Sequence, residues 1–355
     1  MSSPSAIKLP AAEPAALEFP WPAPVEPGQV QQVAEGVYWL RMPLPFALNH
    51  INLWLLRDGE GWAAVDCGIG LGETRTWWER ILADVVGPAG LARVIVTHFH
   101  PDHFGNAAWL TQKFGAPLWM TETEYLTATA QYRQLPGFGS DASAALFSAH
   151  GLDAGRTAAV SGRGNSYAKI VGEPPLQFTR MLDGDSLEIG ANRWRVITGY
   201  GHSPEHAALH CESLGVLISG DMLLPKISTN ISVWPNKPES DPLKLFLRSI
   251  DRFSELPPDT LVLPSHGLPF RGAHLRVRAL HEHHRDRLTE VIEACSRPST
   301  AADLLPVLFR RELDTHQVFF AMGESIAHLN YLWLQGKLAR TQGSDGVYRF
   351  SGRPA

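Results

Sequence analysis

Residues 97–103 read Thr-His-Phe-His-Pro-Asp-His and place four side chains that can bind a metal within six positions. They directly follow the apolar run 94–96, Val-Ile-Val, which predicts a buried strand. The H-x-H step puts the imidazoles of His98 and His100 on one side of an extended segment, and the pair Asp102-His103 turns back toward them as a helix begins. Imidazole and carboxylate together suit zinc, iron or manganese. Core packing does not explain such a cluster at the end of a buried strand, so we interpret it as a metal site.

Three further candidate ligands also follow predicted strands. His202 comes after the strand predicted at 194–198, Asp221 after 216–218 and His266 after 261–263, each beside a Gly or Pro. Glycine lets the backbone turn tightly enough to point a side chain back over the edge of a sheet. Loops gathered at one sheet edge commonly assemble a polar site from distant parts of a sequence. We therefore expect these three side chains to join the first four.

This ordered set resembles that of the metallo-β-lactamase superfamily, in its glyoxalase II-like branch, over roughly residues 30–272. The resemblance implies that His98, His100 and His202 bind one metal ion, that Asp102, His103 and His266 bind a second, and that Asp221 bridges both. It also implies that Asp66, at the end of its strand, supports the ligands without binding metal. The implied cofactor is a pair of divalent ions, expected to be Zn²⁺, with Fe or Mn as alternatives. One departure is Tyr200-Gly201 before His202, where relatives usually carry Pro-Gly.

The order of predicted elements indicates an α/β fold. Short apolar runs at 37–40, 51–56 and 62–65 predict strands, residues 72–86 have helical spacing, and strands then alternate with helices. This order, repeated twice, favours an αββα sandwich, in which two mixed β-sheets pack face to face under outer helices. We place it at 30–272, and we interpret the long polar stretch 131–175 as a lid or substrate-binding insertion.

The two ends of the chain differ from this region. Residues 1–29 are rich in Pro and Ala and predict an extended, poorly packed arm. Residues 273–355 predict three helices followed by a hairpin, a small winged-helix-like domain. This region resembles the C-terminal winged-helix module of β-lactamase-like protein 2 and its bacterial relatives, most clearly in Ala321-x-Gly323-Glu324 through His328-Leu329.

The ligand set predicts an enzyme, a binuclear metal-dependent hydrolase. Two divalent ions about 3.5–4 Å apart can hold a hydroxide at neutral pH, because metal binding lowers the pKa of a water toward about 7. Asp102 has the catalytic role here, since it can bind metal with one oxygen and orient a proton with the other. The chain contains neither a G-x-S-x-G motif nor a P-loop, so two rival catalytic designs lack their parts.

The substrate remains open among several classes. We favour a small-molecule acyl substrate, a carboxylic thioester, ester or lactone, because its carbonyl suits such a nucleophile and the insertion could shape an acyl pocket. Phosphodiester or RNA cleavage is the alternative suggested by the winged helix, but residues 273–355 hold 11 Lys/Arg against 9 Asp/Glu, and residues 1–272 carry −7. Nucleic-acid channels usually need clustered cations. Iron-dependent persulfide oxidation and a non-catalytic, DNA-binding regulator are further alternatives.

Other residues carry weaker signals. His206, Tyr200 and Lys226 could contact substrate or support the ligands, as could residues 228–230. Tyr125, Tyr132, Arg163 and Tyr167 could line a pocket, although each one singly is interpreted as an ordinary loop or core residue.

Cysteine usage and hydropathy bear on the surroundings of the protein. The three cysteines are far apart and are expected to be free thiols of a reducing cytosol. No run reaches the roughly 18 apolar residues that a membrane span needs, so we expect a cytoplasmic protein without a membrane partner. A homodimer formed through the winged helix is the assembly we favour.

Overall fold

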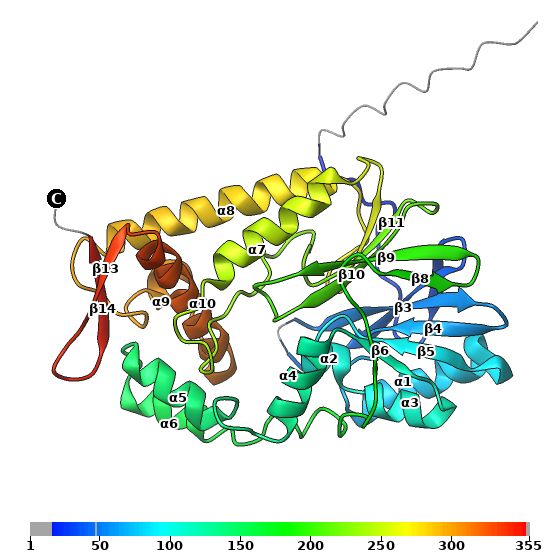
Figure 1. Ribbon diagram of the computed structural model, residues 1–355, viewed down its shortest axis with the longest axis horizontal. Helices are drawn as coiled ribbons and strands as arrows, with labels where there is room; N and C mark the ends of the chain where they lie inside the picture. Colours follow the sequence, from blue (N-terminus) through cyan, green and yellow to red (C-terminus); the bar gives the residue numbers. More distant parts are fainter. Residues whose placement is uncertain (1–15, 47, 353–355) are drawn as a thin grey trace, which may run out of the picture.

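The computed structural model describes residues 16–46 and 48–352, and it shows two β-sheets packed face to face with helices on their outer faces (Figure 1). The first sheet has the strand order β1 (Val30–Ala34), β2 (Val37–Pro43), β3 (His50–Asp58), β4 (Gly61–Val65), β5 (Leu91–Ile95), β6 (Leu118–Met120) and β7 (Thr179–Arg180). The second has the order β12 (Leu261–Pro264), β11 (Val216–Gly220), β10 (His206–Cys211), β9 (Asn192–Gly199) and β8 (Ser186–Ile189). The predicted α/β fold with two mixed sheets is confirmed.

Strand directions bring several strand ends to one edge. In the first sheet β4, β5 and β6 run parallel, whereas β1 to β4 are antiparallel. In the second sheet β11 and β12 are parallel, and β9 runs in the same direction because β9 and β11 are both antiparallel to β10. The carboxyl ends of β4 and β5 therefore share one edge of the first sheet, and those of β9, β11 and β12 share one edge of the second.

Apolar side chains fill the space between the sheets and under the outer helices. Between the sheets, Trp39 and Trp54 of the first sheet pack in one cluster with Trp194 of the second, and all three are buried. On the outer side of each sheet, a second set of apolar side chains packs with the covering helices. Trp78, on the helix over the first sheet, belongs to one such cluster, and Phe246, on the helix over the second sheet, belongs to the other. The helices of these layers are α1 (Gly72–Ile81), which continues as a π-helical turn at Leu82–Val86, α2 (Pro101–Phe104), α3 (Ala107–Phe114), α4 (Glu122–Tyr132) and α7 (Pro242–Asp251).

The stretch 131–175, for which the sequence showed no clear helical period, is partly helical. It contains α5 (Ser140–Ala149) and α6 (Ala154–Ser161), which pack on each other. Phe147 of α5 and Val160 of α6 are buried in the same apolar cluster as the C-terminal helices. Glycine and serine interrupt the local helical pattern here, and short helices of this kind gain their stability mainly from tertiary packing.

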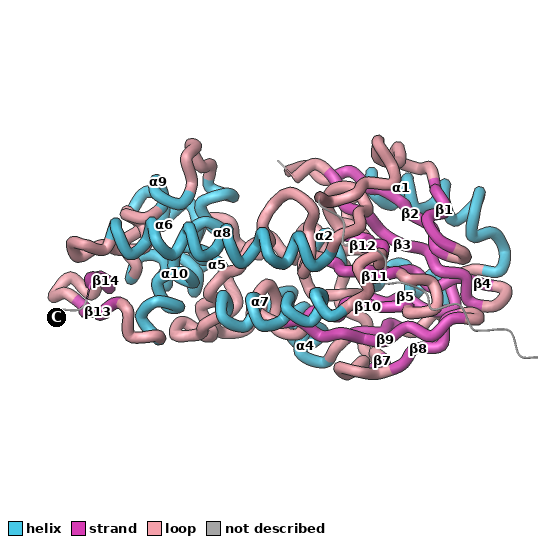
Figure 2. Tube along the Cα trace, turned by 90° about the horizontal axis from the view of Figure 1, so that it is seen from above, coloured by secondary structure: helices cyan, strands magenta, loops and turns pink. Residues whose placement is uncertain are grey.

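The C-terminal region forms a helical layer beside the sandwich (Figure 2). It comprises α8 (Ala273–Ala294), α9 (Leu305–Leu308), α10 (Thr315–Leu334), β13 (Leu338–Gln342) and β14 (Tyr348–Gly352). Its core is continuous with the outer face of the second sheet, since Val262 of β12 and Ile326 of α10 belong to one buried cluster. Three helices and a hairpin occur in the expected order, although α9 has only one turn; a winged-helix classification stays a prediction.

The described part of the arm predicted over residues 1–29 packs against the rest of the protein at a few side chains. Residues 1–15 lie outside the described residues. Leu17 and Phe19 pack against the C-terminal core, Val25 is buried, and Glu18 pairs with Arg271 through the backbone. The apolar side chains between the prolines account for this docking.

Within 16–46 and 48–352, no helix combines the length and the apolar character that crossing a membrane requires.

Candidate metal centre

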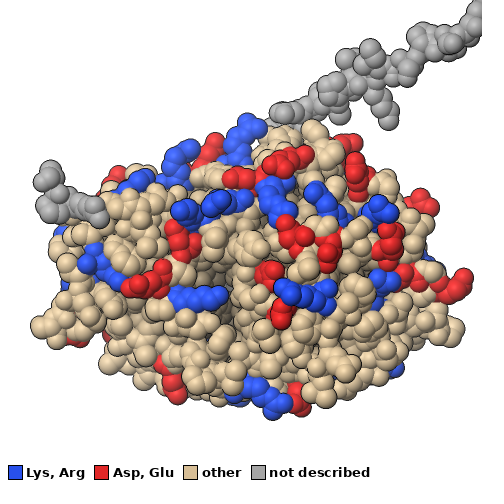
Figure 3. Space-filling view, viewed as in Figure 1, with Lys and Arg blue, Asp and Glu red and all other residues tan. Residues whose placement is uncertain are grey.

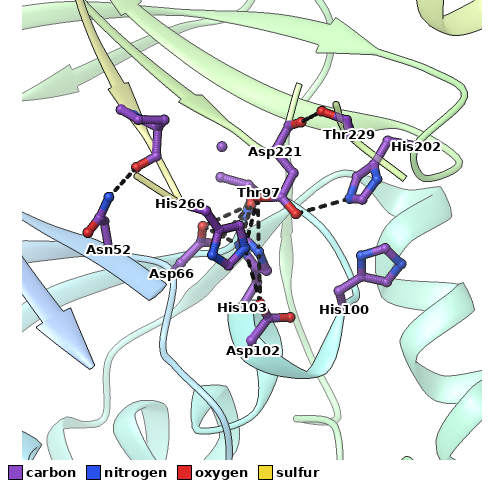
Figure 4. A network of polar contacts seen from close by, with 12 residues as sticks. Asn52, Asp66, Thr97, His100, Asp102, His103, His202, Asp221, Thr229 and His266 are labelled. Atoms are coloured by element: carbon purple, nitrogen blue, oxygen red, sulfur yellow. Dashed lines mark hydrogen bonds and ion pairs between the residues drawn. The ribbon is translucent and has the colours of Figure 1, made fainter. Parts of the chain in front are cut away.

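The seven predicted ligands lie together at the shared edge of the two sheets, and Figure 4 labels six of them, all except His98. They form two groups, each of which could hold a metal ion: His98, His100, His202 and Asp221 in the first, and Asp102, His103 and His266 in the second. Within each group the candidate ligand atoms all lie within 4.8 Å of one another. The structure thus brings together every residue of the sequence-derived set.

Asp221 lies between the two groups. Its Oδ2 is 3.3 Å from Nε2 of His202, while its Oδ1 is 3.5 Å from Nε2 of His103 and 3.4 Å from Nε2 of His266. Oδ2 of Asp102 is 3.4 Å from the same nitrogen of His266. Ligand atoms about 2.1 Å from a tetrahedral zinc ion stand about 3.4 Å apart. The spacing of these atoms therefore suits a small divalent cation in each group.

Three histidines have their second ring nitrogen held by an acceptor. Nδ1 of His103 donates to Oδ2 of Asp66 at 2.7 Å, Nδ1 of His202 to the carbonyl of Asn230 at 2.8 Å, and Nδ1 of His266 to the carbonyl of His50 at 2.7 Å. Because carboxylates and carbonyls only accept, Nδ1 carries a proton in each ring, which leaves Nε2 as the nitrogen that can bind a metal. This is the arrangement that metal-binding histidines need.

Two buried polar atoms at the site without hydrogen-bond partners indicate whether a cation would fit there. Among the described residues, Nε2 of His103 and Oδ1 of Asp221 have no partner in hydrogen-bond geometry. Nε2 of His98 also lies 2.9 Å from Nδ1 of His100 and 3.1 Å from Nε2 of His202, so several acceptor atoms converge on one point. A buried polar atom without a hydrogen-bond partner is costly, and a divalent cation bound among these atoms would satisfy all of them. The donor set therefore fits divalent metal.

The protonation of the two groups differs in the absence of metal. Burial and the neighbouring His202 lower the pKa of His100 to about 3. Burial works against the charged form of His266 too, but Asp221 and Asp102 outweigh it and raise its pKa to about 10. In Asp102, burial is outweighed by His103 and His266, which lower its pKa to about 2. The second group is therefore a histidinium–carboxylate cluster before metal binds.

Asp66 is hydrogen-bonded to the segment that carries the first four candidate ligands. It follows β4 with a φ of 61°, a left-handed conformation that is unfavourable for a residue with a Cβ. Its Oδ1 accepts from the backbone N–H of Thr97 at 2.8 Å, and Thr97 Oγ1 donates to both carboxylate oxygens. Asp66 thereby ties the end of β4 to the residue that precedes His98, and it holds His103 at the same time.

Glu124 is a supporting residue that sequence reasoning missed. This buried residue of α4 accepts from the backbone N–H of Phe99 through Oε2 and from Ser203 Oγ and the N–H of Glu205 through Oε1, at 3.0, 2.6 and 2.6 Å. It joins the loop that carries His98 and His100 to the loop that carries His202. Burial raises its pKa to about 7, against the opposing effect of these hydrogen bonds. A single Glu in a helical pattern gives no sequence signal for this role.

The loop that carries His266 is held by β3. Asn52 donates from Nδ2 to the carbonyls of Pro264 and Gly267, each at 2.8 Å, and its Oδ1 accepts from Nε1 of Trp39 at 2.9 Å. No motif marks Asn52 in the sequence, because its partners in that loop are more than 200 positions away.

The weaker candidates occupy different places. His206 is buried, and its Nε2 accepts from the backbone N–H of Asp221 at 3.1 Å, so it positions that ligand. A Cβ at Gly220 would lie 2.2 Å from this ring nitrogen, which explains the glycine before Asp221. Tyr200 and Lys226 are exposed and are not among the described residues that line the adjoining cavity, so the expectation that they reach substrate gains no support. Ser228, Thr229 and Asn230 do line it.

A cavity of about 660 Å³ opens onto the ligands. His100, Asp102, His202, Asp221 and His266 line one part of it. The remainder is largely apolar and is formed by the loop after β2, by α5 with the segment after α6, and by α10. Arg163 and Tyr167 of the insertion line this cavity, whereas Tyr125 and Tyr132 are not among its described lining residues.

Comparison with known proteins decides the family. The model of the metallo-beta-lactamase superfamily matches residues 48–266, and that of the metallo-beta-lactamase-like C-terminal domain matches residues 288–353. The chain belongs to the metallo-β-lactamase superfamily. The match contains all seven candidate ligands and Asp66.

Relatives within this superfamily include solved structures and curated proteins. The crystal structure of a β-lactamase domain protein from Burkholderia ambifaria is 48% identical and has a TM-score of 0.89, covering 95% of this chain and 98% of that chain. The metallo-beta-lactamase family protein TTHA1429 from Thermus thermophilus is 32% identical, with a TM-score of 0.78 over 91% of this chain and 100% of that one. The probable metallo-hydrolase YqjP of Bacillus subtilis is 26% identical over 88% of this chain and 97% of that protein. Human acyl-coenzyme A thioesterase MBLAC2 is 24% identical, over 54% of this chain and 65% of the human protein.

Proposed function

We propose that the protein is a binuclear metal-dependent hydrolase of carboxylic thioesters or esters that carry an apolar acyl chain. The observation that carries this proposal is the cavity, in which a largely apolar chamber opens directly onto the two ligand groups. Substrate sites are commonly apolar clefts of about 300–1,000 Å³ with a few converging polar groups. An acyl chain can occupy the chamber while its carbonyl faces the ligands.

The metal ions would supply an activated water and polarise the carbonyl oxygen. The residues of the chain perform the remaining tasks. His98, His100 and His202 would hold one ion, and His103 and His266 the other, with Asp221 between them. Asp102 Oδ2 faces His266, which leaves its second oxygen to orient the water or accept its proton. Asp66 and Glu124 keep the ligand loops at a fixed separation, so little reorganisation is needed during the reaction.

Charge supports an acyl substrate over a nucleic acid. On the face drawn in Figure 3, Lys and Arg side chains alternate with Asp and Glu rather than forming one basic stripe. Among the residues that the structure describes, the side chains of Arg163, Lys169 and Arg311 nevertheless line the cavity, and these cations suit an anionic leaving group. A thiol that bears phosphates, such as coenzyme A, has this chemistry, and the human relative is named an acyl-coenzyme A thioesterase.

The metal and the assembly are part of the same proposal. We take Zn²⁺ as the metal, because the histidine-rich set and the spacing near 3.4 Å suit it. We take a cytoplasmic homodimer joined through the C-terminal domain as the working form. Elemental analysis and light scattering of the purified protein test the metal and the dimer directly.

Turnover on a substrate panel tests the activity. Zinc-loaded protein would be assayed on short-chain and long-chain acyl-coenzyme A esters, an acyl-glutathione, a lactone, bis-p-nitrophenyl phosphate and a short RNA. The proposal expects hydrolysis of the thioesters, with kcat/KM rising with chain length, and its loss in Asp102→Asn. Cleavage of RNA or of the phosphodiester without thioester turnover would overturn it.

A further inference from the structure

The C-terminal helix α10 contacts a segment of the metal domain at three places. The backbone N–H of Val233 donates to the carbonyl of Gly323, and Nδ2 of Asn330 donates to the carbonyls of Pro238 and Ser240 at 2.9 and 3.0 Å. At the third place, Nδ2 of Asn230 donates to Oε2 of Glu324 at 3.0 Å. Segment 230–240 therefore lies fixed along α10.

The close approach of α10 to segment 230–240 depends on Gly323. A Cβ at this position would lie 2.6 Å from Oγ and 2.7 Å from Cβ of Ser232. Ser232 in turn donates from Oγ to Oδ1 of Asn230 at 2.8 Å. The amide of Asn230 is thus held at both ends, by Ser232 at its oxygen and by Glu324 at its nitrogen.

Asn230 connects this contact to the metal site. Its carbonyl accepts the Nδ1 proton of His202 at 2.8 Å, and this bond fixes both the ring orientation and the lone pair at Nε2. Two hydrogen bonds therefore link Glu324 to His202: one from the side chain of Asn230 to the carboxylate of Glu324, and one from His202 to the backbone carbonyl of the same Asn230.

We propose that Glu324 is a positioning residue of the metal centre, by which the C-terminal domain sets the orientation of His202 through Asn230. The inference rests on metal binding at the seven ligands and not on the identity of the substrate. It assigns the C-terminal domain a role in assembling the first ligand group. The second group, with His103 and His266, is held by Asp66 and by His50 instead.

The site of Glu324 supports a specific role. Glu324 lines the cavity beside Phe319, Phe320 and Ala321 of the same helix, which also contributes His316 and Gln317 to the lining. Burial raises the pKa of Glu324 to about 7, opposed by its bond to Asn230. A carboxyl group in such surroundings is costly to desolvate, and Asn230 is the one hydrogen-bond partner of this side chain among the described residues.

Zinc affinity of the full-length protein, measured by competition with a chromophoric chelator, tests the inference without reference to activity. Disturbing a group that orients a metal-binding histidine typically weakens metal affinity by about 10–100-fold. We expect a loss of this size for one zinc equivalent in Glu324→Ala. Asn230→Ala keeps the carbonyl but breaks the link, and it should show the same loss even if Glu324→Ala does not fold. Glu324→Gln retains an acceptor oxygen and should restore affinity to near the wild-type level.

Two controls separate this role from general docking of the helix. Asn330→Ala removes two hydrogen bonds from α10 to Pro238 and Ser240 of the same segment. It should leave zinc affinity within about threefold, because these partners hold no metal-binding histidine. Glu324→Ala should have no further effect in a His202→Ala background, whereas its effect should persist in His266→Ala. Unchanged affinity in both Glu324→Ala and Asn230→Ala, an equal loss in Asn330→Ala, or a full additional loss in the His202→Ala background would overturn the inference.

Discussion

Oδ2 of Asp66 accepts a hydrogen bond of 2.7 Å from Nδ1 of His103, and both side chains are buried. The carboxylate thus fixes the ring that presents Nε2 to the second ligand group, and it also accepts from Thr97. Asp66 belongs to neither candidate ligand group, but its hydrogen bonds join the end of β4 to the segment that carries His98 and His103.

Replacing Asp66 by Asn should weaken metal binding. The Asn amide would turn N–H groups toward the donors of Thr97 or His103, so at least one buried donor would lose its acceptor. We expect metal affinity to fall by about 10–100-fold, measured by chelator competition. Wild-type affinity in a folded Asp66→Asn protein would contradict the role assigned to this carboxylate.

Metal uptake should release protons at neutral pH. In the metal-free protein, burial disfavours the charged ring of His266, but Asp221 and Asp102 outweigh burial and hold its pKa at about 10, so this ring is protonated at neutral pH. A cation must displace that proton, and apparent affinity should therefore rise with pH up to about 10. Zinc addition to weakly buffered protein with a pH indicator measures the release. His266→Ala should release less, and the absence of any release from wild type would show that the ring is neutral beforehand.

The same shift makes a prediction for the stability of the metal-free protein. The pKa of His266 in the folded state lies above its ordinary value of 6.5, so its contribution to folding is fully present below pH 6.5 and is lost as pH rises through 10. Urea unfolding in excess chelator should show wild type losing this advantage over His266→Gln between these pH values. A constant difference between the two proteins across that range would contradict it.

Glu124 should make the folding stability depend on pH over a lower range than His266 does. Burial raises its pKa from 4.5 to about 7, so the stability it contributes is greatest below pH 4.5 and is lost as pH rises through 7. Glu124→Gln carries no charge to bury, and the wild type should therefore lose stability relative to this variant as pH rises between these two values. Parallel urea unfolding curves over this range would contradict the burial effect.

Gly105 should tolerate no side chain. A Cβ there would lie 2.4 Å from the backbone nitrogen of Gly70 and 2.6 Å from the carbonyl of Gly68, just after the helix that carries Asp102 and His103. Overpacking of this kind costs about 1–3 kcal/mol, so Gly105→Ala should lower the free energy of unfolding and reduce metal affinity. Gly72→Ala, whose Cβ would meet nothing within 4 Å, is the matched control and should be neutral or stabilising.

The ligands could be predicted because each follows a strand and carries chemistry that packing does not need. His98 follows β5 of the first sheet, whereas His202 and His266 follow β9 and β12 of the second. β9 and β12 run in the same direction, so their carboxyl ends lie at one edge of that sheet. Local hydrophobic pattern is sufficient to find strands of this kind. The seven side chains then needed only a shared edge to meet.

The supporting residues could not be predicted in the same way. Asn52, Glu124 and Glu324 are single polar residues in ordinary strands or helices, and their partners lie 13 to 215 positions away. Such contacts depend on tertiary packing, which leaves no local pattern. The helices α5 and α6 were missed for a related reason, because their buried faces form only against α10 and its neighbours.

The central claim is that seven side chains hold two divalent ions with Asp221 between them. An anomalous difference map, recorded at the zinc edge from crystals of the metal-loaded protein, tests it most directly. The account predicts two peaks about 3.5–4 Å apart, one beside His98, His100 and His202 and one beside Asp102, His103 and His266. A map without a peak among these residues, or with their rings turned away from one another, would contradict it.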